Sequence, residues 1–186
     1  MEKYSENSLE KRIQSGLKEL ISKEKIAGKV KEYAKILDQN YPNNNLIILM
    51  IMKGAICLTA DLIRAMNTSP PIQHINCSSY GSNGSSRGEL KISGLDKIDV
   101  KGKHVLLVDD ICDSGFTMKE AFYQVSLKDP LSVKTMALLL RKAESPSGFV
   151  PDYSLFDVER DDFLVGYGLD YKERFRGLSG IYTTHF

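Results

Sequence analysis

Apolar runs and helical patterns alternate along this chain. Three runs are dominated by apolar residues, at positions 46–52, 105–108 and 133–140. Such runs are typical of strands that are buried on both faces of a sheet. Before and between the runs, apolar residues recur at helical spacing from Ile26, Ile56 and Met118 onward. This alternation predicts an α/β fold with a mainly parallel central sheet flanked by helices.

Cap and turn residues mark the limits of this pattern. Ser22 is placed to cap the first helix and Pro42 to stop it. Residues 1–11 are polar, so we expect poor order there. Serine, glycine and proline at 145–151 break the pattern, and short strands or loops are expected beyond them. The chain shows no internal repeat, and its length suits a single domain.

Candidate chemistry concentrates in residues 104–117, which read HVLLVDDICDSGFT. Asp109 and Asp110 follow the buried strand, and open α/β sheets place their ligands at this end of their strands. Gly115 permits turn geometry that other residues resist, just before the predicted helix. The unpaired N–H groups at the start of that helix form, with neighbouring hydroxyls, a cradle sized for one phosphate group. The hydroxyls are those of Ser114 and Thr117.

An Asp-Asp pair after a strand is also found in unrelated kinds of site. Receiver domains hold magnesium with such a pair and accept a phosphoryl group, but there the pair lies near the start of the fold, not beyond the middle as here. A DDxxD site for a diphosphate-bound metal belongs on a helix, whereas this stretch interrupts a strand-to-helix turn. Solvated acids at a strand end, with no ligand, are a third interpretation.

Unshielded carboxylates repel phosphate, and a ribose phosphate removes this conflict because its hydroxyls can bond to the acids. Residues 105–117 resemble the signature with which phosphoribosyltransferases bind phosphoribosyl pyrophosphate: an apolar strand, two acids and an Asp-Ser/Thr-Gly-x-Thr loop. The resemblance implies that Asp109 and Asp110 hold the ribose hydroxyls, directly or through Mg²⁺, and that Asp113 is the general base. The loop that would bind the phosphate consists of Ser114, Gly115, Phe116 and Thr117.

Two further segments match parts of the same family. Lys53 and Gly54 follow the first apolar run, where a cation and N–H groups could hold an anion; taken alone, this is a weak signal. The resemblance makes it the pyrophosphate loop. Residues 78–88 are rich in glycine and serine, which is typical of a plain surface loop, and they contain Ser79 and Tyr80. A Ser-Tyr pair also marks the family's mobile flap, which would close over the site and exclude water.

Residues 163–171, FLVGYGLDY, resemble the base-binding hood of the purine-salvage branch, the hypoxanthine-guanine phosphoribosyltransferases. The resemblance implies that Phe163 stacks on the base and that the Leu164 backbone recognises the purine edge. It also implies a magnesium-associated carboxylate at Asp170 and a pyrophosphate contact at Arg176. Without the family, ordinary packing and solvated charges would account for these four residues. The implied division is a core at about 22–145 and a hood at about 1–21 plus 146–186.

The sequence departs from the family's pattern at two places. The family commonly has Glu-Asp where Asp109 and Asp110 stand, so we expect the shorter Asp109 to contact its ligand through water. A lysine that contacts the purine oxo group normally follows the third apolar run, but here Arg141 holds that place with Lys142 next. Either Arg141 contacts the purine oxo group, or a one-residue shift of the strand brings Lys142 to that position. A cationic donor favours a 6-oxopurine over adenine, and a guanidinium is planar and bulkier than an ammonium.

The resemblance implies transfer of the 5-phosphoribosyl group to hypoxanthine, guanine or both, with Mg²⁺ as the cofactor. The products would be IMP or GMP and pyrophosphate. Two alternatives stay open: a non-catalytic regulator that senses phosphoribosyl pyrophosphate on the same fold, and a xanthine-preferring purine phosphoribosyltransferase. The retained Asp113, the flap and the hood argue against the regulator. The family also implies a homodimer or homotetramer.

Composition limits the expected partners and the expected cellular compartment. The formal net charge is +1, which gives no electrostatic reason to expect nucleic acid or an anionic membrane as a partner. Cys57, Cys77 and Cys112 form no CxxC pair and leave an odd thiol, which favours a reducing compartment. The polar N-terminus lacks a signal segment, and no apolar run approaches membrane-spanning length. We therefore expect a cytoplasmic protein.

Overall fold

The computed structural model describes residues 16–43, 45–79, 90–141, 146–159 and 163–184. In these ranges the strands are β1 (Lys18–Ile21), β2 (Leu46–Met52), β3 (Ile72–Ser79), β4 (Leu90–Ser93), β5 (His104–Cys112), β6 (Ser132–Arg141), β7 (Tyr153–Val158), β8 (Phe163–Val165) and β9 (Ile181–Thr184). The helices are α2 (Lys23–Asn40), α3 (Ile56–Ala65), α4 (Phe116–Ser126) and the 3₁₀ helix η1 (Leu95–Lys97). The three apolar runs therefore form β2, β5 and β6, as expected.

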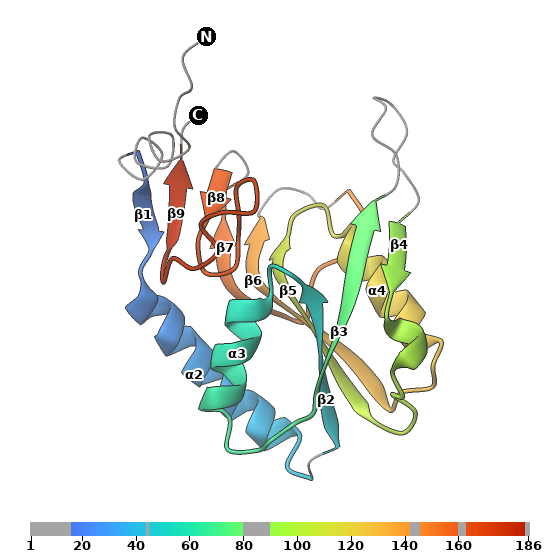
Figure 1. The fold of residues 1–186 in the computed structure, drawn as a ribbon. Coiled ribbons are helices and arrows are strands. Elements are labelled where there is room, and N and C mark those ends of the chain that lie inside the picture. The colour runs from blue at the N-terminus through green and yellow to red at the C-terminus, as the bar shows by residue number, and fades with distance from the viewer. Residues whose placement is uncertain (1–15, 44, 80–89, 142–145, 160–162, 185–186) are drawn as a thin grey trace.

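Two sheets organise the described part of the chain (Figure 1). The larger has the strand order β4-β3-β2-β5-β6-β7, in which only the β3–β4 pair is antiparallel. The smaller has the order β1-β9-β8 and is antiparallel. The predicted α/β fold with a mainly parallel central sheet is confirmed.

Helices cover both faces of the larger sheet, which accounts for its continuous apolar runs. Ile48 and Leu106 pack in a core with α2 and α3, whereas their chain neighbours Leu49 and Leu107 pack in a second core with α4. Successive side chains of a strand point to opposite faces, so each run supplies both cores. Figure 1 shows α2 and α3 on one side of the sheet and α4 on the other.

The first helix begins and ends as its cap signals predict. The Lys25 backbone N–H donates to the Ser22 hydroxyl at 3.4 Å, and α2 ends at Asn40, just before Pro42. None of the helices in the described part of the chain combines the length and the apolar character needed to span a bilayer.

Four strands differ from the expectation. Tyr153–Val158 was expected in the hood, but β7 pairs with β6 in the larger sheet, and the Tyr33 hydroxyl donates to the Ser154 carbonyl at 2.7 Å. Lys18–Ile21 and Ile181–Thr184, which lack a long apolar run, form β1 and β9 by pairing with each other. The short β4 forms as an antiparallel partner of β3, which continues to Ser79. Pairing across the chain, rather than local pattern, determines these strands.

The strand order reverses between β2 and β5. From β2 the chain proceeds to β3 on one side, and from β5 it proceeds to β6 and β7 on the other side. In open α/β sheets, ligands bind at the carboxyl ends of the strands at such a switch point. The segments that follow these two ends contain Lys53–Gly54 and residues 113–117, so the topology brings the two predicted loops to one place.

Candidate active site

Asp109 and Asp110 lie within β5, not beyond its end. The strand was expected to stop at Val108, but its pairing with β6 continues through Ile111 and Cys112, so β5 ends at Cys112. Asp109 is 7% exposed, and its Oδ1 accepts the Asp110 backbone N–H at 2.9 Å. The carboxylates are therefore held by regular strand geometry, and the loop proper begins at Asp113.

A hollow of about 290 Å³ lies between the end of β5 and the start of α4. Gly115 adopts φ +74° as the residue before α4, a conformation that favours glycine, so its predicted role in the turn is confirmed. We call this cavity the Asp109 hollow. Its lining consists of Asp109–Gly115, Thr117 and Met118, with Ile51 of β2 and Cys77 of β3. Phe116 does not line it, and its side chain is 37% exposed.

Electrostatics in the Asp109 hollow disfavour bare carboxylates. Burial raises the pKa of Asp109 well above its ordinary value, and the neighbouring charge of Asp110 adds to this effect. Burial also raises the pKa of Asp110, although the hydrogen bonds it accepts and the Arg176 guanidinium act in the opposite direction. A cation or a set of hydroxyl donors would therefore stabilise both charged carboxylates.

The Lys53–Gly54 turn packs directly against the Asp109 hollow. A Cβ atom added to Gly54 would overlap the Asp110 carboxylate. On its other side, a Cβ at Gly168 would overlap the Gly54 carbonyl oxygen, and Gly168 has φ +103°. The neighbour of Gly54 is therefore the Asp110 side chain, whereas the neighbour of Gly168 is the Gly54 backbone, which leaves room only for glycine at position 168. The peptide bond between Met52 and Lys53 is cis.

Four charged side chains form a cluster beside this turn. Arg176 Nη2 lies 2.8 Å from Asp170 Oδ1, and its Nη1 donates to the Gly168 carbonyl at 2.7 Å. Lys53 Nζ lies 2.9 Å from Glu173 Oε2, which is also 3.4 Å from Arg176 Nη2. The structure thus brings together Lys53, Asp170 and Arg176, which the sequence analysis singled out, and adds Glu173, which it did not.

Of the three predicted base-binding residues, the structure brings Arg141 into contact with Asp113. Arg141 Nε lies 3.4 Å from Asp113 Oδ1, and Arg141 Nη1 donates to the Glu159 carbonyl at 2.9 Å. The Phe163 side chain is 44% exposed, so part of a flat aromatic ring is accessible for stacking. Its ring meets the Tyr171 ring edge-on, with centroids 5.5 Å apart. Leu164 is buried in the first core.

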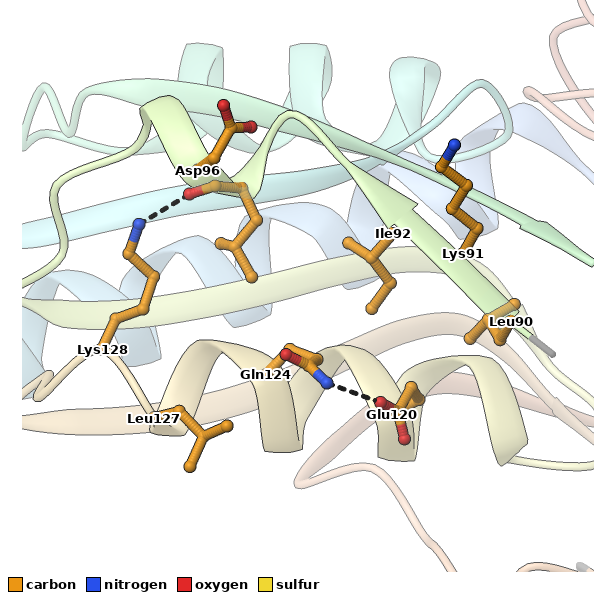
Figure 2. Close-up of a pocket in the computed structure, with 9 residues that line it drawn as sticks. Leu90, Lys91, Ile92, Asp96, Glu120, Gln124, Leu127 and Lys128 are labelled. Atoms are coloured by element: carbon orange, nitrogen blue, oxygen red, sulfur yellow. Dashed lines mark hydrogen bonds between the residues drawn. The ribbon is translucent and has the colours of Figure 1, made fainter.

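A larger groove, of about 650 Å³, lies between β4, η1 and α4 (Figure 2). Leu90 and Ile92 of β4 face α4 across it, and it shares no lining residue with the Asp109 hollow. Lys128 Nζ donates to the Leu95 carbonyl at 2.7 Å, and the Gln124 amide donates to Glu120 at 2.9 Å. Because these polar groups satisfy one another, we assign this groove no reaction.

Comparison with known proteins identifies the family. Residues 16–172 match the phosphoribosyl transferase domain. This chain belongs to the phosphoribosyltransferase family. Its relatives include the hypoxanthine-guanine phosphoribosyltransferase of Aquifex aeolicus (strain VF5), which is 40% identical over 167 residues that cover 89% of this chain and 93% of that protein. The enzyme of the same name from Bacillus subtilis (strain 168) is 36% identical over 164 residues, which cover 88% and 91%.

Solved structures of phosphoribosyltransferases share this architecture over 90% or more of the chain. A hypoxanthine phosphoribosyltransferase from Staphylococcus aureus aligns with a TM-score of 0.85 at 29% identity and covers 97% of each chain. The hypoxanthine phosphoribosyl transferase of Trypanosoma cruzi aligns with a TM-score of 0.83 at 31% identity, over 90% of this chain and 91% of that one. The predicted type I phosphoribosyltransferase fold is confirmed, and so is the resemblance to the purine-salvage branch.

Some of the predicted residues lie where the structure gives no description of their side chains. Tyr80 and Lys142 are outside the described residues, and of Ser79 only the backbone is described, at the end of β3. Sequence reasoning missed Cys77 and Ile51, which line the Asp109 hollow from β3 and β2. Their position close to the ends of their strands was the available signal, since every parallel strand ends at the same edge.

Proposed function

We propose that this protein is a purine-salvage enzyme. It transfers the 5-phosphoribosyl group from phosphoribosyl pyrophosphate to a 6-oxopurine, hypoxanthine, guanine or both, giving IMP or GMP and pyrophosphate. The observation that carries this proposal is the Asp109 hollow at the switch point of the sheet, where paired carboxylates adjoin a helix start. The names of the relatives from Aquifex aeolicus and Bacillus subtilis support the same reaction.

Phosphoribosyl pyrophosphate would lie across the two loops. Asp109 and Asp110 accept hydrogen bonds from the ribose hydroxyls, and the N–H groups at the start of α4 bind the 5-phosphate beside the hydroxyls of Ser114 and Thr117. The amides and cations next to the Asp109 hollow bind the pyrophosphate; they belong to Lys53, Gly54 and Arg176.

The residues present suit magnesium. Among the described residues, no cluster of three or more His, Cys, Asp or Glu side chains is arranged to enclose a metal. Mg²⁺ does not need one, because it keeps several waters and takes its other ligands from one or two carboxylates and substrate phosphates. Asp109, Asp110 and Asp170 offer such carboxylates. A cation would offset the free-energy cost of burying the first two in their charged form. When bound, it would neutralise charge that develops on the pyrophosphate.

The reaction exchanges one bond at the ribose C1′ for another. The bond from C1′ to the pyrophosphate oxygen breaks, a purine ring nitrogen bonds to C1′, and the ring proton passes to the Asp113 carboxylate. Positive charge builds on the sugar as the bond breaks, so nearby carboxylates stabilise it while Lys53 and Arg176 stabilise the leaving group. Arg141 lies 3.4 Å from Asp113, where it orients that carboxylate.

The base would be held by the residues around Asp113. Arg141 donates to the purine oxo group, Phe163 stacks on the ring, and the Leu164 backbone meets the purine edge. The 3.4 Å contact between Arg141 and Asp113 and the partly exposed Phe163 ring support this assignment. The resemblance would assign Ser79 and Tyr80 to a flap that covers the substrates and excludes water.

An absorbance assay of purified protein tests the proposal. We expect turnover of hypoxanthine, guanine or both with phosphoribosyl pyrophosphate and Mg²⁺, and none with adenine. Xanthine as the best substrate would instead establish the xanthine-preferring alternative. Binding of phosphoribosyl pyrophosphate without turnover of any of the four bases would establish the non-catalytic regulator.

We further propose a homodimer or homotetramer in a reducing cytoplasm. All three cysteines, Cys57, Cys77 and Cys112, are described and are free thiols, which supports a reducing compartment. Work on the Trypanosoma cruzi relative concerns the role of its C-terminal region in oligomeric state. Size-exclusion chromatography with light scattering should give two or four times the chain mass of 20.9 kDa; a monomer would contradict the assembly.

A further inference from the structure

Glu173 lies between the two side chains that we assign to pyrophosphate. Its Oε2 atom is 2.9 Å from Lys53 Nζ and 3.4 Å from Arg176 Nη2. In the sequence, Glu173 is 120 positions from Lys53 and three positions from Arg176. The contact therefore joins the Lys53–Gly54 turn to the C-terminal segment. One carboxylate is thus shared by both cations, although Arg176 has a second and closer partner in Asp170.

The backbone around Glu173 holds it in this place. Its N–H donates to Asp170 Oδ2 at 2.8 Å, and the other oxygen of Asp170 is bound to Arg176. Lys172, Glu173 and Phe175 all have positive φ, at +51°, +63° and +71°. Non-glycine residues rarely adopt this conformation, and here they do so in a turn closed by the Asp170 carboxylate. The turn therefore directs the Glu173 side chain toward Lys53.

The Glu173 side chain is nevertheless free to leave. It is 64% exposed, and Lys53 is 59% exposed, whereas Arg176 is only 23% exposed. An ion pair so open to solvent contributes little to stability, because water screens it and both side chains lose freedom in it. A more highly charged anion would displace Glu173 from both cations at little cost.

We propose that Glu173 is an internal competitor for pyrophosphate. In the free protein its carboxylate occupies Lys53 and Arg176, and it releases both when the pyrophosphate group binds. This inference rests on the proposed function, because it takes Lys53 and Arg176 as pyrophosphate ligands. Glu173 lowers pyrophosphate affinity in two ways that add: it engages the cations, and its own charge repels the incoming anion. The weaker affinity favours release of the product.

The Glu173→Gln variant separates this role from a structural one. Glutamine keeps the size and the backbone N–H that binds Asp170 but removes the charge. We expect the Kd for inorganic pyrophosphate with Mg²⁺, measured by isothermal titration calorimetry, to fall about three- to tenfold, the range of one or two exposed ion pairs. The product-inhibition constant of pyrophosphate should fall by the same factor.

Glu32→Gln is the matched control. Glu32 pairs with Lys29 at the same distance, 2.9 Å, and is similarly exposed at 52%, but it lies on α2 away from the site. Its pyrophosphate Kd should equal that of the unmodified protein. In a Lys53→Gln background, the gain from Glu173→Gln should shrink, because only Arg176 remains to be released.

An unchanged pyrophosphate Kd in Glu173→Gln overturns the inference, because it shows that Glu173 does not compete. A higher Kd overturns it too, because it shows that Glu173 positions the cations for pyrophosphate. An undiminished gain in the Lys53→Gln background overturns it as well. Failure of the proposed function looks different: the unmodified protein then turns over none of the four bases. Circular dichroism checks that each variant is folded. A second variant, Glu173→Ala, also removes the charge and should lower the Kd for pyrophosphate as well.

Discussion

The buried carboxylate of Asp109 shows how a single residue that costs stability suits the ligand contact that we propose for it. It is 7% exposed and accepts a hydrogen bond from the Asp110 N–H at 2.9 Å, while a second carboxylate adjoins it. Burial and the neighbouring charge raise its pKa. An acid whose pKa is higher in the folded than in the unfolded chain loses stabilising free energy as pH rises from its unfolded to its folded pKa.

Asp109→Asn should therefore stabilise the free protein at neutral pH. Asparagine keeps the oxygen that accepts the Asp110 N–H but cannot ionise. We expect a gain of about 1–3 kcal/mol in the free energy of unfolding, the scale of a poorly solvated buried group, and weaker binding of phosphoribosyl pyrophosphate. Differential scanning calorimetry as a function of pH checks this. The gain should vanish below the ordinary carboxyl pKa, where Asp109 is protonated in both states; a gain independent of pH would contradict the argument.

Asp113→Asn tests the general base. We expect turnover to fall about a hundredfold, the lower end of the contribution of a general base, while phosphoribosyl pyrophosphate binds nearly as before. Steady-state kinetics and calorimetric titration measure the two effects separately. Asp129→Asn, at a 79% exposed aspartate, is the control and should leave both unchanged. Normal turnover in Asp113→Asn would remove this residue from the mechanism.

Among the elements, the contact between two turns decides the shape of the site. The Lys53–Gly54 turn between β2 and α3 packs between Asp110 of β5 and Gly168 of the segment after β8. Each approach is too close for a side chain. Packing of the Lys53–Gly54 turn against the Asp110 side chain and the Gly168 backbone therefore fixes the turn beside the carboxylates of β5.

Gly168→Ala should disrupt this packing. Its new Cβ would overlap the Gly54 carbonyl oxygen, and φ +103° is strained for alanine. We expect a loss of about 1–3 kcal/mol of stability and at least a roughly tenfold fall in kcat/KM for phosphoribosyl pyrophosphate. Gly177→Ala is a matched control, since a Cβ there meets nothing within 4 Å. Thermal denaturation and kinetics of the pair measure the difference, and equal behaviour of the two variants would refute the packing argument.

On the scale of the whole molecule, the C-terminal segment must be fixed to the larger sheet for the site to exist. Tyr167 is 6% exposed, and its hydroxyl donates to Asp61 Oδ2 on α3 at 2.8 Å, across 106 residues of sequence. Burial raises the pKa of Tyr167, and the Asp61 hydrogen bond reinforces that shift, so the hydroxyl keeps its proton at neutral pH. The segment around Tyr167 contains the residues predicted to bind the base and pyrophosphate. This hydrogen bond ties that segment to α3, the helix that follows the Lys53–Gly54 turn.

Tyr167→Phe removes that hydroxyl alone. We expect a loss of about 1 kcal/mol, which lowers the Tm by about 2–4 °C for a chain of this length. Tyr123→Phe, at a tyrosine that is 56% exposed on α4, should leave the Tm unchanged. The comparison requires only thermal denaturation at fixed protein concentration. An unchanged Tm in Tyr167→Phe would show that the segment is held without this bond.

The sequence predicted three of the six strands of the larger sheet, because β2, β5 and β6 are buried on both faces and their apolar runs are visible locally. The turn at Asp113–Gly115 was predicted as well, because Gly115 marks it. Phe116 and Thr117, which were expected in the same loop, are instead the first residues of α4. β1, β4 and β9 were not predicted, since each is short and forms only through its partner. Glu173 gave no local signal, because a charged residue in a turn is ordinarily solvated.

The sequence by itself determined the fold class and the two turns at which we propose that ligands bind, because apolar periodicity, a turn glycine and a contiguous motif act within a few residues of one another. Only the tertiary structure decided which distant polar side chains meet: Glu173 with Lys53, Arg141 with Asp113, and Asp61 with Tyr167. Such contacts depend on where the strand order reverses and on how the C-terminal segment folds back. No local pattern encodes either, since both result from packing the whole chain around two cores.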